Sequence, residues 1–277
     1  IMGSGIARNL LKAGLPVTVW NRGPERLSAF GGKAELATSP AAAAAAADIV
    51  ITMVADDQAS QEVWEAEGSG IFAGVRSGAL LLECSTVSPG RIAALAARAV
   101  ECGCSFMDAP VAGSKAQLEQ RQVVFLVGGS AENLARARPA LEPSARAILH
   151  LGPVGAGAKA KLVNNMMMGA QVALLAEGLA LATKMGLDVQ ALVPLLTEGA
   201  AASPAVKSAL PRILEGDFEP RFPLYLQHKD LGYAVAESWH LGLQLPVAEA
   251  ALSTYSRALE AGRGELDFSS VGQGVLG

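Results

Sequence analysis

Residues 155–165, Gly-Ala-Gly-Ala-Lys-Ala-Lys-Leu-Val-Asn-Asn, contain the side chains best suited to chemistry. Lys161 and Asn165 are four residues apart, so on a helix they share one face, whereas Lys159 points about 160° away from Lys161. A carbonyl that accepts a hydride becomes an alkoxide and needs a proton. A lysine ammonium beside an amide can donate it while stabilising the negative charge. Such a pair is often only structural, so its position in the chain must decide.

The first residues, Ile1-Met2-Gly3-Ser4-Gly5, predict a loop that enters a helix. Gly3 stands where the third glycine of a GxGxxG motif would be, and such glycines let the backbone approach a pyrophosphate at a helix N-terminus. The first two glycines and the first strand are absent, so we expect further sequence to precede Ile1. Ile1, Met2 and Gly3 are candidate cofactor contacts, with an ordinary helix beginning at a glycine as the alternative.

The next predicted strand ends in Trp20-Asn21-Arg22, about 20 residues beyond the glycines, where an NAD-preferring fold places an acidic side chain on the ribose 2′-hydroxyl. No acidic residue is present here. Asn21 can form hydrogen bonds, and Arg22 can pair with a 2′-phosphate. The pattern favours NADP(H), with a solvated surface arginine as the alternative.

Small and polar residues follow three further predicted strands, at the carboxyl ends where doubly wound sheets bind ligands. Val54 and Ala55 follow one strand. Thr86 follows the next and can contact the nicotinamide amide or ribose, although it could instead cap a helix. A later loop of small residues includes Ala112 and Gly113, whose backbone N–H groups can form an anion nest for a substrate carboxylate. A simple turn is the alternative.

Residues 222–230, Phe-Pro-Leu-Tyr-Leu-Gln-His-Lys-Asp, place a second charged pair in an aliphatic context. Lys229 can close over the cofactor, and Asp230 can hold Lys161 or the substrate. An ordinary helix salt bridge is the alternative. The three histidines of the chain show no ligand spacing with carboxylates, so no metal site is predicted.

The hydrophobic pattern predicts the elements that must position these residues. Up to about residue 153, short aliphatic runs alternate with helical patterns, as in the βαβ units of a parallel sheet. The predicted strands span residues 17–20, 49–53, 79–83, 105–108, 123–127 and 148–151. From residue 158 onward only helical periodicity is found, with predicted helices at 158–185, 189–197, 204–214, 224–241 and 247–261. We predict a Rossmann-type doubly wound α/β domain, residues 1–153, lacking its first strand, and an all-α domain, residues 154–277.

The composition excludes several classes of protein. The 277 residues are 51% hydrophobic and 17% charged, and the net charge is −4. Lys and Arg are scattered, which argues against nucleic acid or an anionic membrane as a partner. No uninterrupted apolar run reaches the roughly 18 residues of a membrane span. Three cysteines without CxxC spacing indicate neither disulfides nor zinc and fit a reducing compartment. We expect a cytoplasmic protein, with an organelle as the alternative.

Taken together and in this order, the motifs resemble the β-hydroxyacid dehydrogenase family, which includes 3-hydroxyisobutyrate dehydrogenase, tartronate semialdehyde reductase and glyoxylate/succinic semialdehyde reductase. The resemblance spans essentially the whole chain. It rests on the glycine loop, Ser-Thr-Val-Ser-Pro at 85–89, Asp-Ala-Pro-Val at 108–111, the Gly-x-Gly-x-x-x-Lys-x-x-Asn-Asn helix and Lys-Asp-Leu at 229–231. Asn21-Arg22, Gly-Ser-Lys at 113–115, Phe-Pro-Leu at 222–224 and Leu-Asp-Phe-Ser at 266–269 are most similar to plant-type glyoxylate/succinic semialdehyde reductases, which use NADPH.

The resemblance implies a role for each matching residue. It makes Lys161 the catalytic lysine and Asn165 its partner. Thr86 and Lys229 match cofactor contacts, and residues lining the active site are matched by Phe222 and Asp230. The family usually has serine where Ala112 stands, so one hydroxyl contact to the substrate carboxylate is lost here.

We therefore predict an enzyme that uses NADP(H) to reduce small aldehyde acids, glyoxylate to glycolate and succinic semialdehyde to 4-hydroxybutyrate. A 3-hydroxyisobutyrate or tartronate semialdehyde oxidoreductase is an alternative, and Asn21-Arg22 disfavours the former. A non-catalytic NADP-binding or interaction module would keep the fold without the chemistry, but the retained Lys161 and Asn165 argue against it. The apolar helical half suggests the contacts of a homo-oligomer.

Overall fold

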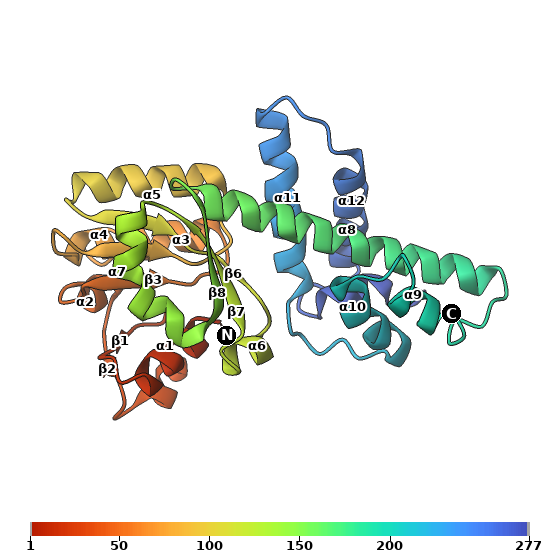
Figure 1. Ribbon diagram of the computed structural model, residues 1–277, viewed down its shortest axis with the longest axis horizontal. Helices are drawn as coiled ribbons and strands as arrows, with labels where there is room; N and C mark the ends of the chain where they lie inside the picture. The colour runs from red at the N-terminus through yellow and green to blue at the C-terminus, as the bar shows by residue number, and fades with distance from the viewer. Residues whose placement is uncertain (1, 276–277) are drawn as a thin grey trace. The chain divides into compact units, whose positions relative to one another are not determined.

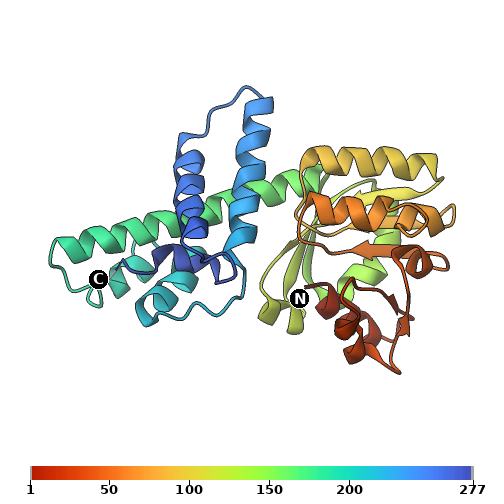
Figure 2. The ribbon, with the colours of Figure 1, turned by 180° about the vertical axis from the view of Figure 1, so that it is seen from behind.

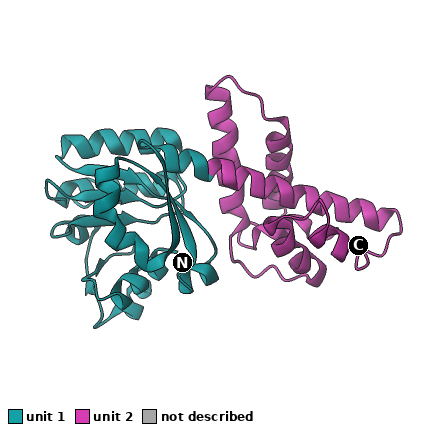
Figure 3. Ribbon diagram, in the orientation of Figure 1, with its two compact units in different colours: residues 1–161 teal, residues 162–277 magenta. Residues whose placement is uncertain are grey.

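The computed structural model describes residues 2–275, and the chain divides into two compact units, residues 1–161 and 162–277 (Figure 3). The sequence pattern placed the boundary after residue 153. The observed division falls later, inside the long helix α8 (Ala156–Lys184). The first turns of α8 belong to unit 1 because Ala158 is buried in its core.

Unit 1 contains a six-stranded sheet in which β3, β4, β5, β7 and β6 are neighbours in that order and β8 pairs with β7. The strands are β3 (Ile49–Thr52), β4 (Leu80–Glu83), β5 (Ser105–Asp108), β6 (Val111–Ala112), β7 (Val123–Gly128) and β8 (Ala145–Gly152). The first three run parallel, as predicted, and β8 is parallel to β7. However, β7 is antiparallel to β5 and β6, so the sheet is mixed rather than wholly parallel. The connection from β5 to β7 contains only β6 and the short α6 (Lys115–Glu119), not a long crossover helix.

Helices cover both faces of this sheet because β4, an inner strand, is apolar on both sides. Leu80 and Leu82 of β4 share a buried cluster with side chains of α1 (Met2–Lys12) and α7 (Ala131–Leu141). Leu81 faces the other way and clusters with α3 (Asp57–Glu65) and α5 (Pro89–Glu101). Figure 1 shows α7 on one side of the sheet, and in Figure 2, seen from behind, α3 lies in front of it. This is the predicted doubly wound arrangement.

The smaller elements of unit 1 lie between these. β1 (Thr18–Val19) lies within the strand predicted at residues 17–20, whereas β2 (Glu35–Leu36) was not predicted, and the two form their own two-stranded parallel sheet. Ser39 caps α2 (Pro40–Ala44) by accepting the N–H of Ala42. The remaining helical segments are η1 (Pro24–Phe30), α4 (Ile71–Gly74) and η2 (Glu142–Ser144).

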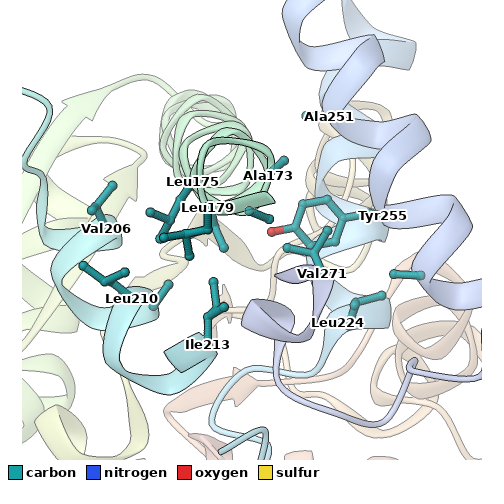
Figure 4. Close-up of a cluster of buried hydrophobic side chains, with 14 of the residues drawn as sticks. Ala173, Leu175, Leu179, Val206, Leu210, Ile213, Leu224, Ala251, Tyr255 and Val271 are labelled. Atoms are coloured by element: carbon teal, nitrogen blue, oxygen red, sulfur yellow. The ribbon is translucent and has the colours of Figure 1, made fainter. Parts of the chain in front are cut away.

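Unit 2 consists, as far as residue 275, of helices joined by loops. They are most of α8, then α9 (Val193–Glu198), α10 (Pro204–Glu215), α11 (Leu224–His240), α12 (Pro246–Glu260) and η3 (Phe268–Gly272). In the core, Leu175 and Leu179 of α8 cluster with Leu210 of α10 and Tyr255 of α12 (Figure 4). The Tyr255 hydroxyl lies 3.4 Å from the Gly169 carbonyl oxygen, and its burial raises the pKa of the phenol.

Helix α8 is, within residues 2–275, the one helix long and apolar enough to cross a membrane by length and composition. Its most apolar window is 39% buried within the structure. Val172, Leu175 and Leu179 are nearly inaccessible in the core of unit 2. We therefore interpret α8 as the core helix of a globular unit.

Candidate active site

The N-terminal end of α1 is shaped for a close neighbour. A Cβ at Gly3 would lie 3.2 Å from the Cβ of Met53, so glycine lets α1 begin close against the end of β3. The first turn of α1 contains no acidic residue, which leaves the positive end of the helix suited to an anion. Met2 is the first residue of this helix, whereas the predicted contact at Ile1 lies outside the described residues.

The loops after β3 and β4 are tied to each other. The N–H of Val54 donates to Ser85 Oγ at 2.7 Å, and the N–H of Ser85 donates to Glu83 Oε1 at 3.0 Å. The other oxygen of Glu83, which is fully buried, accepts Trp64 Nε1–H at 2.8 Å. Val54, Ala55 and the half-buried Thr86 are thus held at one edge of the sheet. Sequence reasoning missed Glu83 and Ser85, although a glutamate at the end of an apolar strand was a usable signal.

Asn21 and Arg22 lie at the surface after β1. Asn21 Oδ1 accepts the N–H of Gly23 at 2.9 Å, which forms a local turn. The Arg22 side chain is 84% exposed and lies 3.7 Å from a carboxylate oxygen of Glu62. An exposed pair of this kind is weak, so the guanidinium can exchange this partner for a phosphate.

The helix that carries Lys161 begins on a buried carboxylate. Asp108, the last residue of β5, accepts the N–H of Gly155 at 2.6 Å and the N–H of Ala158 at 2.7 Å. Burial raises the pKa of the Asp108 carboxyl, and the donated N–H groups oppose that rise. Lys161 follows within a turn of Ala158 and is 9% exposed, whereas Lys159, which points away from Lys161 on the helix, is exposed. Asp108 was not among the predicted site residues.

The segment predicted as a small-residue loop is partly a strand. Ala112 belongs to β6 and pairs with Val124 of β7. Gly113 has a φ of 147°, and a Cβ there would lie 3.0 Å from Val123 Cγ1, so both conformation and space favour glycine. The N–H of Ser114 is donated to the side chain of Gln117 at 2.8 Å. The Ser114 N–H is therefore not available to an anion. Only the backbone near Ala112 and Gly113 is left for the predicted anion nest.

In unit 2, Asp230 binds two of the predicted site residues. Asn165 Nδ2–H donates to Asp230 Oδ2 at 2.6 Å, and Lys229 Nζ lies 2.9 Å from Asp230 Oδ1. Gln227 Nε2–H donates to the backbone oxygen of Asn165 at 2.9 Å. The Lys229 ammonium also lies 4.8 Å from the centroid of the Tyr233 ring. Gln227 was missed because a glutamine on a helix has no distinctive spacing.

Phe222 precedes α11 in a loop fixed by a buried carboxylate. Its N–H donates to Asp267 Oδ2 at 3.1 Å, and its ring centroid lies 5.8 Å from that of Phe268. The edge-to-face ring pair fixes the Phe222 side chain. Within residues 2–275, no group of three or more His, Cys, Asp or Glu side chains could hold a metal ion.

The residues of unit 1 fit a dinucleotide with a 2′-phosphate. The first turn of α1 offers N–H groups and contains no acidic residue, and Arg22 is an accessible cation where the strand end has no carboxylate. The tied loops at Val54 and Thr86 lie after two neighbouring parallel strands, where such folds bind ligands. The donor set therefore fits an NAD(P) dinucleotide.

Two family models match the chain and together cover nearly all of it. The first describes the NAD binding domain of 6-phosphogluconate dehydrogenase and matches residues 1–152. The second describes the NAD-binding domain of NADP-dependent 3-hydroxyisobutyrate dehydrogenase and matches residues 155–273.

Similar proteins carry both enzymatic and non-enzymatic names. Glyoxylate/succinic semialdehyde reductase 2 of Arabidopsis thaliana is 35% identical over 98% of this chain and 76% of its own length. The cytokine-like nuclear factor N-PAC of Xenopus tropicalis is 34% identical over 98% of this chain, which spans about half (51%) of that protein. A solved structure, Mycobacterium tuberculosis 3-hydroxyisobutyrate dehydrogenase with L-serine, is 32% identical, with a TM-score of 0.88 over 98% of this chain and 94% of that one.

Proposed function

The chain belongs to the β-hydroxyacid dehydrogenase family and is an NAD(P)-dependent oxidoreductase, and from that premise we propose that it reduces small aldehyde acids with NADPH. The proposed reactions convert glyoxylate to glycolate and succinic semialdehyde to 4-hydroxybutyrate. The observation that carries the proposal is the buried Lys161 within the first turns of α8, anchored through Asp108. The identity with a protein named for both substrates supports the substrate class.

When bound, NADPH supplies the hydride that adds to the aldehyde carbon. The carbonyl π electrons then move to the oxygen, and the Lys161 ammonium donates a proton to it and stabilises the charge as it develops. The hydroxy acid is the product, and the neutral lysine regains its proton from water.

Asn165 serves this lysine as a hydrogen-bond acceptor. Its Nδ2–H is donated to Asp230, so the amide oxygen is the atom left for other partners. That oxygen accepts one bond from Asn164 at 3.0 Å and has a second lone pair. An amide oxygen one turn along α8 can accept a hydrogen bond from the ammonium and orient it.

The remaining predicted residues are assigned to binding. We assign Met2, Gly3, Val54, Ala55 and Thr86 to the cofactor, with Asn21 and Arg22 at its 2′-phosphate and Lys229 closing over it. The backbone near Ala112 and Gly113 would bind the substrate carboxylate, and Phe222 and Asp230 would line the substrate pocket. Because Ala112 has no hydroxyl, we expect a weaker hold on the carboxylate than a serine would give.

A pair of lysine variants tests the proposal. Lys161→Ala is expected to lower kcat by about 10²–10⁴-fold, the usual contribution of a positioned acid, with NADPH binding retained. Lys159→Ala is the matched control, because this lysine lies on the same helix and is exposed. It should leave kcat unchanged. Purified protein that binds NADPH but consumes none with either aldehyde would refute the enzyme proposal, and an active Lys161→Ala variant would refute the mechanism.

Two alternatives are supported by particular similarities. Oxidation of 3-hydroxyisobutyrate, which the sequence analysis named together with tartronate semialdehyde oxidoreduction, is favoured by the 0.88 TM-score to a 3-hydroxyisobutyrate dehydrogenase. Turnover of each substrate with NADPH and with NADH separates these from the proposed reductase. A non-catalytic NADP-binding module is favoured by the similarity to N-PAC. Consumption of NADPH with either aldehyde would exclude this alternative.

We also propose that the protein is a homo-oligomer. Four exposed apolar side chains on α8 form what we call the α8 stripe: Val163, Met167, Leu174 and Leu181. Their spacings of four and seven residues place them along one face, about 27 Å long at 1.5 Å per residue. The same stripe on a second copy is its own complement under twofold symmetry, so we assign that copy as its partner.

A further inference from the structure

We propose that Asp108 is a positioning residue for the reduction: by binding the first turn of α8 it fixes the place of Lys161, a role that rests on the function proposed above. Asp108 belongs to the sheet, and Lys161 is the residue that delivers the proton. All the contacts that connect them lie within unit 1.

The connection consists of two short hydrogen bonds to one carboxylate. Asp108 Oδ1 accepts the N–H of Gly155 at 2.6 Å, and Oδ2 accepts the N–H of Ala158 at 2.7 Å. These N–H groups have no acceptor within the helix, and an anion there also suits the positive end of the helix. A carboxylate that binds two points of one turn restricts both its displacement and its rotation.

Asp108 is itself held firmly. It pairs in register with Glu83 of β4 on one side and with Gly128 of β7 on the other. The next residue, Ala109, donates its N–H to the Glu83 carbonyl at 2.8 Å. The anchor of α8 is therefore the middle of the sheet and not a mobile loop.

Three glycines make room for this contact. Gly155 has a φ of 93°, a left-handed conformation that glycine adopts without strain. A Cβ at Gly157 would overlap the Leu126 carbonyl oxygen and lie 2.9 Å from Asp108 Oδ2, and a Cβ at Gly128 would overlap Asp108 Oδ1. The two glycines of the Gly-x-Gly-x-x-x-Lys sequence thus allow α8 to pack close against the Asp108 carboxylate.

The same residue connects the proton donor to the predicted substrate loop. Asp108 ends β5, and the chain continues through Ala109 and Pro110 into β6, which contains Ala112. The backbone of Asp108, which is paired in the sheet, leads to the segment assigned to the substrate carboxylate, whereas its side chain alone binds α8. A displacement of about 1 Å in such a constellation can cost about 100-fold in rate.

The test compares Asp108→Asn and Gly157→Ala with Ser130→Ala in the full chain. In Asp108→Asn, the side-chain NH₂ group faces a backbone N–H, so two donors meet and one hydrogen bond is lost. In Gly157→Ala, the new Cβ lies too close to Asp108 Oδ2 and displaces α8 from the carboxylate. Ser130 caps α7 in the same unit by accepting the N–H of Asn133 at 3.1 Å, so its variant loses a helix cap without touching α8. The measurements are kcat, KM for the aldehyde, Kd for NADPH, the solvent deuterium isotope effect on kcat and hydrogen exchange of residues 155–161.

We expect both α8 variants to lower kcat by about 10–100-fold while KM and Kd change less than about threefold. The solvent isotope effect on kcat should rise, because proton transfer becomes slower. The α8 amides should exchange faster in both variants, and Ser130→Ala should change none of these values.

Three results would overturn the inference. The first is a kcat for Asp108→Asn within about twofold of the parent, and the second is a kcat that falls only with the fraction of folded protein while the isotope effect stays constant. The third is an unchanged hydrogen-exchange rate of the α8 amides, which would show that Asp108 does not anchor α8. This result can be obtained even if the parent turns over neither aldehyde. Absence of turnover in the parent would refute the proposed function separately.

Discussion

Replacing Lys229 by methionine should destabilise the protein more than replacing its partner Asp230 by asparagine. The Lys229 and Asp230 side chains are 14% and 2% exposed and lie 2.9 Å apart. Lys229→Met keeps the apolar stem beside Tyr233 but leaves a buried carboxylate with only the Asn165 amide. Breaking a buried pair costs about 3–5 kcal/mol, and the remaining amide bond reduces this to about 2–4 kcal/mol.

The reverse change is expected to cost less. In Asp230→Asn the lysine can turn its ammonium towards water on its flexible stem, and the new amide still bonds to Asn165. We expect a loss of about 1–2 kcal/mol. The double variant should cost less than the sum of the two single variants, with a coupling energy of about 1–2 kcal/mol.

Urea unfolding of the parent and the three variants, followed by far-ultraviolet circular dichroism, measures these values. Hydrogen-exchange rates of the α11 amides show whether the loss of stability arises in unit 2. The matched control is a cycle on the exposed pair Arg138 and Glu142, where a coupling of at most about 0.5 kcal/mol is expected. The reasoning fails if the two cycles give the same coupling, or if Asp230→Asn proves more costly than Lys229→Met.

Three further outcomes are expected. Arg22→Ala should lower kcat/KM with NADPH by about 10-fold or more, the value of one charge-assisted contact, and leave NADH turnover unchanged; equal losses with both cofactors would contradict the assignment. Leu174→Glu should convert the oligomer to a smaller species in light scattering, and an unchanged mass would exclude the α8 stripe as the interface. Burial raises the pKa of Cys84 well above that of a free thiol. The thiol therefore contributes stability below its unfolded pKa of about 8.5 and loses it as the pH rises further. Cys84→Ala should reduce this loss of stability, and an unchanged pH dependence would refute the assignment.

The sequence was sufficient for the elements that have a strong pattern of their own. The long helix predicted at residues 158–185 is observed as Ala156–Lys184, and the strand predicted at 105–108 is observed with the same bounds. The strands β2 and β6 were missed because two residues are too short to show a period. The antiparallel β7 was predicted as a strand but not its direction, since an apolar run contains no sign of its neighbours.

The site residues divide in a similar way. Lys161 and Asn165 could be proposed from the sequence because their relation is local, four residues along one helix. Asp108 and Glu83 were missed because their partners, such as Gly155, are brought together by the fold. For both carboxylates the signal was a charged residue at the end of an apolar strand, since a charge is rarely buried without partners.

The Lys/Asn pair also explains why spacing was informative here. Lys161 is the last residue of unit 1 and Asn165 lies in unit 2, yet both belong to one continuous helix. The backbone hydrogen bonds of α8 therefore set the spacing between Lys161 and Asn165, the residues that we propose as proton donor and acceptor amide. Asp108 holds the turn before the lysine, and Asp230 holds the amide. Each buried carboxylate fixes one end of the pair, so loss of either should alter orientation while the helical spacing survives.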